Sequence, residues 1–382
     1  MGEVGSVSMC RRIFKEQTSE SGDIPFYKIG TFGGQADAFI SEELFAEYRS
    51  KYPYPKEGDI LISASGSIGR TVEFTGGNEY FQDSNIVWLS HDDRLDNTFL
   101  KYFYSVVKWA GIEGSTIKRL YNDNILHTVI SMPSVAEQKK IGAFFKELDH
   151  LITLHQRKLD RLKNIKKSML DKMFPKDGEV VPEIRFKGFT DAWEQRKLGD
   201  VGTTYTGLSG KAKEDFGHGN GKFITYMNVF SNSVASSEMT EPVEIDDRQN
   251  KVISGDVLFT TSSETPEEVG MSSVWLEKSE NTYLNSFCFG YRASIVFEPY
   301  YLAYMFRSSS VRKKITFLAQ GISRYNISKN KMMNIEIFVP TMSEQQQVGE
   351  YFRKLDHLIT LHQRKLDKLK NIKKSMLDNM FV

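Results

Sequence analysis

The sequence has few of the features that mark an enzyme, a secreted protein or a membrane protein. Only two cysteines occur among 382 residues, Cys10 and Cys288, and their separation argues against both a disulfide framework and a cysteine zinc site. We therefore expect a reducing, cytoplasmic environment. No apolar run approaches the roughly 20 residues that a membrane helix needs, so a membrane partner is not expected.

Motifs that would indicate catalysis are also missing. The segment Gly207–Lys211 only superficially resembles a phosphate-binding loop, and neither a G-x-G-x-x-G nor an N-P-P-Y/F motif occurs. His155 and His362 lack further ligands at helical spacing, which favours packed histidines over a metal site. The sequence therefore predicts a non-catalytic chain with no catalytic residue, metal or cofactor of its own. A formal net charge of +1 means that any nucleic-acid footprint must be local.

What the sequence does contain is a long internal repeat. Residues 148–174 and 355–381 match at 25 of 27 positions, with an offset of 207 residues. The regions before the two copies are of similar length but share only a skeleton. Two copies at so long a period predict two domains and exclude a solenoid.

The repeated segments have the pattern of long helices. Ser134 and Thr341 each follow a proline and precede a glutamate three residues later, which is typical of a capping box. Apolar residues then alternate by four and three, as in a heptad seam. We expect two long helices, over residues 134–174 and 341–382, that form an antiparallel coiled coil. The residues predicted to pack at its seam are Leu148, Ile152, Leu159, Leu162, Leu355, Ile359, Leu366 and Leu369.

The remaining segments are predicted to form two globular domains and a connector. Residues 1–133 and 200–340 are rich in short β-prone runs, and residues 175–199 lie between the first helix and the second domain. Gly58–Ser63 corresponds to Gly255–Thr260, while the loops that follow these strands differ. The predicted fold class is α+β: two β-rich domains in a pseudo-twofold arrangement, separated by the two helices. Related folds with unlike loops suggest related tasks on unlike targets.

These features together resemble a known family. A variable domain, then P-x-x-x-E-Q-x-x-I/V opening a long helix, occurs at Pro133–Ile141 and again at Pro340–Val348. With PEIRFKGF…W…KLGDV at residues 182–201, the chain closely resembles the specificity (S) subunit of Type I restriction–modification systems. In that family a segment like Pro182–Lys197 usually precedes the first recognition domain too, whereas this chain begins at the equivalent of Leu198, which puts full docking of the first half in doubt.

The resemblance implies a function and a set of partners. Each variable domain would be a target recognition domain that reads one half of a split, asymmetric double-stranded DNA site. The helices would set the spacing of the half-sites, about one helical turn or roughly 34–36 Å. They would also dock two modification (methyltransferase) subunits, and restriction (endonuclease and translocase) subunits would join that core. S-adenosylmethionine, and ATP with Mg, would bind the partners, and the assembled complex would methylate adenine and cleave DNA.

Candidate DNA-contacting residues follow from side-chain chemistry, because arginine can bind guanine with two hydrogen bonds and asparagine can pair with adenine. An ordinary solvated loop is the alternative for each stretch. In the first domain the candidates are Lys118, Arg119, Tyr121, Asn122, Ser63, Ser65, Arg70, Gln82 and Asn85. In the second they are Ser323, Arg324, Tyr325, Asn326, Lys211, Tyr226, Asn228 and Asn285. The alternative function is a coiled-coil scaffold that binds proteins without reading DNA.

Overall fold

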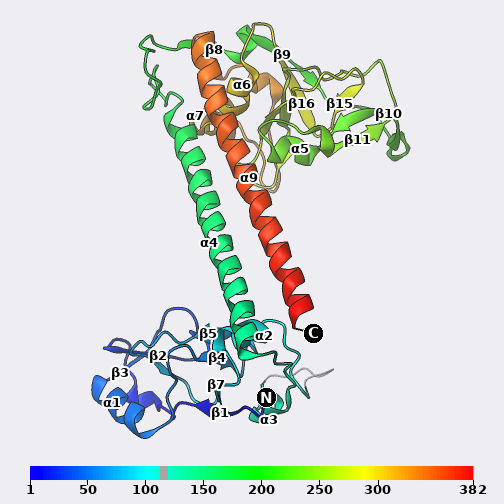
Figure 1. Cartoon of the computed structure of the whole chain (residues 1–382). Helices are drawn as coiled ribbons and strands as arrows, with labels where there is room; N and C mark the ends of the chain where they lie inside the picture. The colour runs from blue at the N-terminus through cyan, green and yellow to red at the C-terminus, as the bar shows by residue number, and fades with distance from the viewer. Residues whose placement is uncertain (112–118, 382) are drawn as a thin grey trace. The chain divides into compact units, whose positions relative to one another are not determined.

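The chain divides into two compact units, described here from a computed structural model that covers residues 1–111 and 119–381 (Figure 1). Unit 1 consists of Met1–Gln156 together with the chain from Arg364 onward, and unit 2 consists of Arg157–Gln363. The long helices α4 and α9 each contribute to both units. The predicted mixture of sheets and helices is confirmed.

Unit 1 contains the first variable domain. Its strands are β1 (Gly5–Met9), β2 (Ile24–Tyr27), β3 (Phe39–Ile40), β4 (Ile60–Ser63), β5 (Thr71–Glu73), β6 (Tyr80–Phe81) and β7 (Ile86–His91). Its helices are α1 (Glu42–Lys51), α2 (Asn97–Tyr104), α3 (Asn122–His127), the first part of α4 (Val135–Lys172) and the last part of α9 (Met342–Met380).

Unit 2 contains the connector and the second variable domain. Its strands are β8 (Glu194–Lys197), β9 (Gly202–Thr206), β10 (Phe216–Ile224), β11 (Thr240–Val243), β12 (Val257–Thr260), β13 (Ser262–Ser263), β14 (Ser272–Val274), β15 (Thr282–Leu284), β16 (Cys288–Ala293), β17 (Tyr325–Asn326) and β18 (Glu336–Val339). Its helices are α5 (Tyr226–Ser231), α6 (Pro299–Met305), α7 (Ser309–Phe317), α8 (Lys329–Met332), the last part of α4 and the first part of α9.

The two units share one topology. The four-stranded antiparallel sheet of unit 1 has the order β1-β7-β4-β5, and unit 2 repeats it as β9-β16-β12-β14. A smaller sheet is repeated as well: β2 pairs antiparallel with β3 and parallel with β6, as β10 does with β11 and β15. The shared skeleton that the sequence suggested is therefore a shared arrangement of strands.

The central strand of each larger sheet is buried on both faces. Ile60 and Ile62 of β4 contribute to an apolar cluster with Phe99 of α2, whereas Leu61 lies in a second cluster with Tyr80. This division follows from the alternation of side chains along a strand. Strand β12 repeats it, with its odd-numbered and even-numbered apolar residues in separate clusters.

The start of α4 is fastened to α2 by a glutamine. The Ser134 hydroxyl accepts the Glu137 N–H at 3.3 Å, which is half of the predicted capping box. The Gln138 side chain accepts the N–H of Asp96, the residue that caps α2, at 2.8 Å, and donates to the Pro133 carbonyl at 2.9 Å. Because the oxygen and the NH2 group of this buried amide both form hydrogen bonds, one side chain positions the N-termini of α2 and α4.

The start of α9 repeats this arrangement and adds an ion pair. Thr341 accepts the Glu344 N–H at 3.4 Å, and Gln345 accepts the Glu298 N–H at 3.1 Å while donating to the Pro340 carbonyl at 2.9 Å. The Glu344 carboxylate does not complete the capping box as the sequence suggested. It instead accepts two hydrogen bonds from the Arg185 guanidinium, at 2.7 and 2.9 Å.

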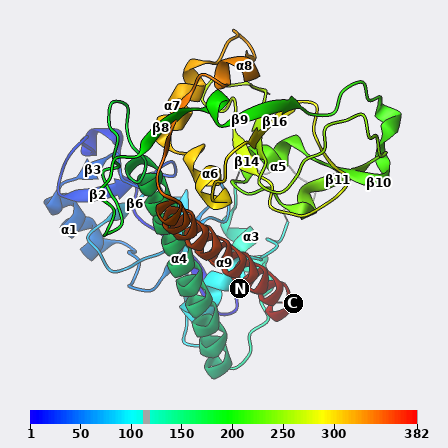
Figure 2. The same cartoon turned by 90° about the horizontal axis from the view of Figure 1, so that it is seen from above.

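Within each unit, segments of the two long helices are joined by a carboxylate. In unit 1, Asp149 accepts from Lys373 at 2.6 Å and from the Tyr102 hydroxyl at 3.0 Å. In unit 2, Asp356 accepts from Lys166 at 2.5 Å, from Tyr304 at 2.9 Å and from Ser233 at 3.1 Å. Figure 2 shows α6, which carries Tyr304, beside α9.

The residues predicted at the helix seam occupy apolar surroundings. In unit 1, Leu148 and Leu369 belong to one cluster with Tyr102 and Phe145. In unit 2, Leu162, Leu355 and Ile359 belong to the large core cluster that also contains Tyr304. Leu159 and Leu366 are buried, and Ile152 is half-buried.

We expect Asp356→Ala to lower the free energy of unfolding by about 1–3 kcal/mol, because it leaves a lysine and two hydroxyls without their acceptor. Asp247→Ala is the matched control, since Asp247 is 82% exposed in its pair with Lys251 and should change stability by less than about 1 kcal/mol. Urea unfolding of the full chain measures both. Equal losses for the two variants would contradict a structural role for the Asp356 contact.

Candidate nucleic-acid interface

In unit 1, three polar candidates meet where β4 ends. The Ala64 N–H donates to the Asn85 carbonyl at 2.7 Å, and the Leu120 N–H donates to the Ala64 carbonyl at 2.7 Å. These bonds draw together loops that are distant in sequence. The Ser65 hydroxyl consequently donates to the Asn85 amide oxygen at 2.9 Å, and Ser65 forms an antiparallel bridge with Arg119.

Tyr121 is the exposed part of this cluster, and Arg119 beside it is half-buried. One Arg119 nitrogen donates to the Ser84 carbonyl at 3.0 Å, and the guanidinium carbon lies 6.0 Å from the centre of the Tyr121 ring. Tyr121 is 63% exposed, and Asn122 beside it is exposed at the start of α3. An arginine beside an exposed ring can contact phosphate and stack on a base. Lys118 lies outside the described residues.

The other candidates of unit 1 are divided between structural and exposed roles. Ser63 is buried, accepts the Arg70 N–H at 2.9 Å and donates to the Ser67 carbonyl, so it shapes the loop. Gln82 accepts the Ile29 N–H at 2.9 Å. Arg70 itself is exposed. Of these three residues, Ser63 is buried, Gln82 is half-buried and Arg70 is exposed.

Unit 2 brings its counterparts together in the same way. The Thr261 N–H donates to the Phe287 carbonyl at 2.9 Å, and the Ile327 N–H donates to the Thr261 carbonyl at 3.0 Å. Strand β13 then pairs with β17, which sets Ser262 opposite Asn326 and Ser263 opposite Tyr325. The Tyr226 hydroxyl donates to the Ser262 carbonyl at 2.7 Å, and burial raises its pKa.

The exposed side chains at this second crossing differ from those of the first. Ser323, Arg324 and Asn326 are exposed. The Asn285 side chain accepts the Phe287 N–H at 2.8 Å, and the Phe287 ring is 57% exposed. Sequence reasoning missed Phe287. The only sequence feature that could have indicated Phe287 is its position as an aromatic residue directly after the polar residues Asn285 and Ser286.

Asn228 is a structural residue in unit 2. It is fully buried, and its amide donates to the Ser236 and Met239 carbonyls while its oxygen accepts from the Ser236 N–H and from Asn232. These contacts use both donors and both lone pairs of the side chain. Nothing remains to read a base.

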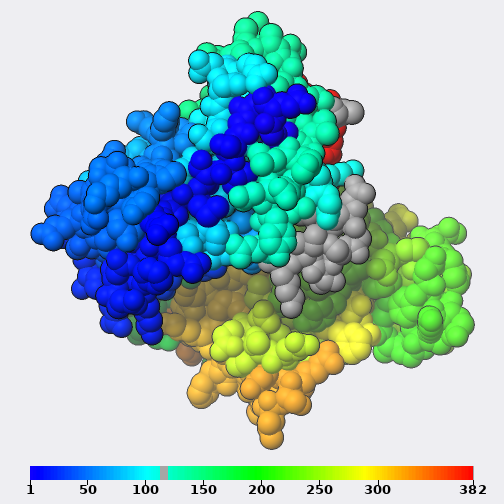
Figure 3. Space-filling view, turned by 90° about the horizontal axis from the view of Figure 1, so that it is seen from below, coloured from blue at the N-terminus to red at the C-terminus, as the bar shows by residue number. Residues whose placement is uncertain are grey.

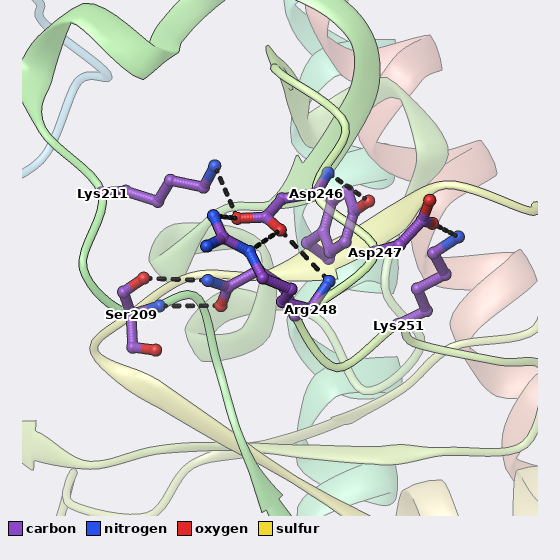
Figure 4. A network of polar contacts seen from close by, with 8 residues as sticks. Ser209, Lys211, Asp246, Asp247, Arg248 and Lys251 are labelled. Carbon is purple, nitrogen blue, oxygen red and sulfur yellow. Dashed lines mark hydrogen bonds and ion pairs between the residues drawn. The ribbon is translucent and has the colours of Figure 1, made fainter.

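Lys211 belongs to an ion-pair network at a different edge of unit 2. Its ammonium lies 3.2 Å from the Asp246 carboxylate, and the two side chains are 11% and 10% exposed. Figure 4 shows Arg248 on the same carboxylate and Lys251 on neighbouring Asp247. Hydrogen bonds from Arg248 are the largest cause of the lowered pKa of Asp246. The Lys211 charge is therefore already neutralised within the fold.

Other kinds of site find no support in the part of the chain that the structure describes. Over residues 1–111 and 119–381, no group of three or more His, Cys, Asp or Glu residues could hold a metal ion. Both thiols are buried, which raises the pKa of Cys10 to about 12 and also raises the pKa of Cys288. A buried, protonated thiol is a poor nucleophile. No described helix is long and apolar enough to span a bilayer.

Comparison with solved structures concerns the fold. The S subunit of a type I restriction–modification system from M. genitalium superposes with a TM-score of 0.53 at 12% identity, over 100% of this chain and 94% of that chain. A second solved chain comes from a study of complex assembly and conformational transition in the type I restriction–modification system. It superposes with a TM-score of 0.55 at 15% identity, over 99% of this chain and 95% of that chain.

Comparison with protein sequences concerns the family. A type I restriction enzyme specificity subunit of Haemophilus influenzae is 59% identical over 152 residues, which is 40% of this chain and 40% of that protein. A second, from Methanocaldococcus jannaschii, is 23% identical over 332 residues, or 84% of this chain and 75% of that protein. The family model for the Type I restriction modification DNA specificity domain matches residues 1–164 and 190–371. The resemblance inferred from the sequence is thereby confirmed, and the chain belongs to the family defined by this DNA specificity domain.

Proposed function

We propose that this chain is the DNA sequence-specificity subunit of a Type I restriction–modification complex, and that each variable domain reads one half of a bipartite, asymmetric DNA site. The observation that carries this proposal is the repeated loop crossing. Both units draw the same pair of loops together, at Ser65–Arg119 and at Ser262–Asn326, but present different side chains there. One scaffold with two unlike polar surfaces suits two unlike half-sites.

The long helices would serve as the spacer between these surfaces. The first part of α4 shares unit 1 with the last part of α9, and the last part of α4 shares unit 2 with the first part of α9. This pairing supports an antiparallel coiled coil with pseudo-twofold symmetry. Asp149 and Asp356, which are 207 residues apart, would be equivalent contacts in it.

The same helices would dock two modification subunits, and restriction subunits would complete the complex. This chain supplies no catalytic group in the proposal. The modification subunits would bind S-adenosylmethionine and methylate adenine, and the restriction subunits would use ATP with Mg. The complex would act in the cytoplasm.

Co-expression with a modification subunit, followed by single-molecule sequencing for methyladenine, tests the proposal. We expect methylation at one split, asymmetric motif. A soluble complex that methylates nothing would contradict the specificity role. Failure to form any complex would favour a coiled-coil scaffold that binds other proteins.

A domain exchange tests the division of labour. Replacing residues 200–340 with the recognition domain of another specificity subunit should change one half of the methylated motif and leave the other half intact, because the loop crossing of unit 1 is untouched. The exchanged complex is compared with the parent complex by the same sequencing. A change in both halves would contradict independent reading by the two domains.

A point substitution tests the loop crossing of unit 1. Arg119→Ala should weaken DNA binding if Arg119 contacts a phosphate. The slope of log K against the logarithm of the salt concentration should then fall by about one in magnitude, because one counterion fewer is released on binding. Lys56→Ala is the matched control, because Lys56 is exposed before β4, at the opposite end of that strand from Ser65. Titrations of the assembled complex at several salt concentrations measure both, and equal slopes for the two variants would remove Arg119 from the interface.

A further inference from the structure

Two side-chain positions flank the residue that joins the loops at each crossing. In unit 1 this joining residue is Ala64, whose N–H donates to Asn85 and whose carbonyl accepts from Leu120. The first position is therefore Asn85, which is half-buried and accepts from the Ser65 hydroxyl. The second is Tyr121, which follows Leu120 and is 63% exposed. Figure 3 shows α3, which begins directly after Tyr121, at the surface of unit 1 beside the N-terminal segment in dark blue.

Unit 2 reverses the aromatic and the polar position. Its joining residue is Thr261, which bonds to Phe287 on one side and to the residue before Ser328 on the other. Phe287 is therefore the counterpart of Asn85, but it is an aromatic residue that is 57% exposed. Ser328 takes the place of Tyr121, and its hydroxyl caps α8. Each crossing thus carries one exposed ring and one polar side chain, in opposite order.

The backbone of Phe287 is held by three hydrogen bonds, although its ring is exposed. Its N–H donates to the Asn285 side chain at 2.8 Å. Its carbonyl accepts from the Thr261 N–H at 2.9 Å and from the Thr261 hydroxyl at 2.7 Å. The next residue, Cys288, begins β16 and is buried. The ring therefore projects from a fixed base, and only two side-chain torsions have to be ordered when it binds a ligand.

Within the described residues of unit 2, no apolar cluster includes the Phe287 ring, whereas the neighbouring Cys288 lies in one of them. A phenylalanine side chain has no hydrogen-bonding group, so it does not bind a phosphate or pair with a base edge. The contacts with DNA that remain are stacking on a base and apolar contact with a thymine methyl group. Phe287 and Tyr121 share a flat ring, and stacking is the contact that depends on this shared property.

We propose that Phe287 and Tyr121 each insert their ring against an unstacked base step in the DNA half-site that their own domain reads. This inference rests on the proposed DNA recognition. Pyrimidine–purine steps unstack at the lowest cost, so each ring favours half-sites that contain such a step at the right place. Because the two rings stand on opposite sides of their crossings, the inserted steps lie at different places in the two half-sites. The rings thereby contribute to the asymmetry of the site.

The test uses the full chain assembled with a modification subunit, and a duplex that carries its methylated motif. Single bases other than the methylated adenine are replaced by 2-aminopurine, an analogue whose fluorescence rises when it unstacks. We expect a rise at one step in each half-site. Phe287→Ala should abolish the rise in the half read by residues 200–340, leave the other half unchanged, and weaken binding about tenfold or more. Tyr121→Ala should abolish the rise in the other half only.

Two further substitutions of the same residue separate stacking from simple apolar contact. Phe287→Tyr keeps a flat ring and should retain the fluorescence rise, whereas Phe287→Leu keeps apolar surface without a ring and should lose it. Ile253→Ala is the matched control, because Ile253 is 47% exposed before β12, at the opposite end of that strand from Thr261. The control variant should match the parent complex in both fluorescence and affinity.

Three outcomes would overturn the inference. If the parent complex binds its motif and Phe287→Ala changes neither fluorescence nor affinity, the ring does not insert, while DNA recognition itself stands. If Phe287→Leu binds as tightly as the parent and neither complex shows a rise, the ring contacts a thymine methyl group instead of stacking. If the parent complex binds no DNA sequence selectively, the proposed function fails and the inference fails with it.

Discussion

The structure depends on a carboxylate that joins the two long helices to a recognition domain. Asp149 and Asp356 each bind a lysine from the other long helix and a tyrosine from the short helix of the neighbouring domain. The lysine also lies over the ring of that tyrosine, at 5.5 Å in unit 1 and 5.3 Å in unit 2. An apolar seam could slide by a turn at modest cost, whereas a carboxylate with two or three specific donors has one position that satisfies them. The aspartate and the lysine of this contact stand at equivalent positions of the two repeated segments.

The repeated helical frame leaves the loops of the two domains free to differ. Gln138 and Gln345 fix the start of each long helix to the short helix of the domain before it, through bonds to the backbone. Backbone contacts do not depend on the side chains at their partner positions, so the domains can diverge while the joint is kept. The crossing of loops at Ala64 and Thr261 is likewise made by main-chain bonds. Each unit can thus offer a different set of polar side chains from an unchanged platform.

The connector covers three groups of unit 2 whose counterparts occur in unit 1. In unit 2, strand β8, Trp193 and Arg185 cover an edge, a ring pair and a carboxylate. In unit 1 the counterpart rings of Phe99 and Phe381 lie 5.0 Å apart with Phe99 buried, and the counterpart carboxylate, Glu137, is exposed.

The sequence by itself determined the repeat, the two long helices, the two related domains and the family, because heptad spacing, capping residues and a 207-residue offset are local or periodic signals. Only the tertiary structure decided which polar candidates are exposed. Asn122 is exposed and Arg119 is half-buried, whereas all the hydrogen-bonding groups of the Asn228 side chain are used within the fold and Lys211 is neutralised by Asp246. An asparagine or a lysine has the same side-chain chemistry in an exposed loop as in a buried network. The role of Asn228 depends on Ser236, 8 residues away, and that of Lys211 depends on Asp246, 35 residues away. These partners become neighbours only when the sheets form.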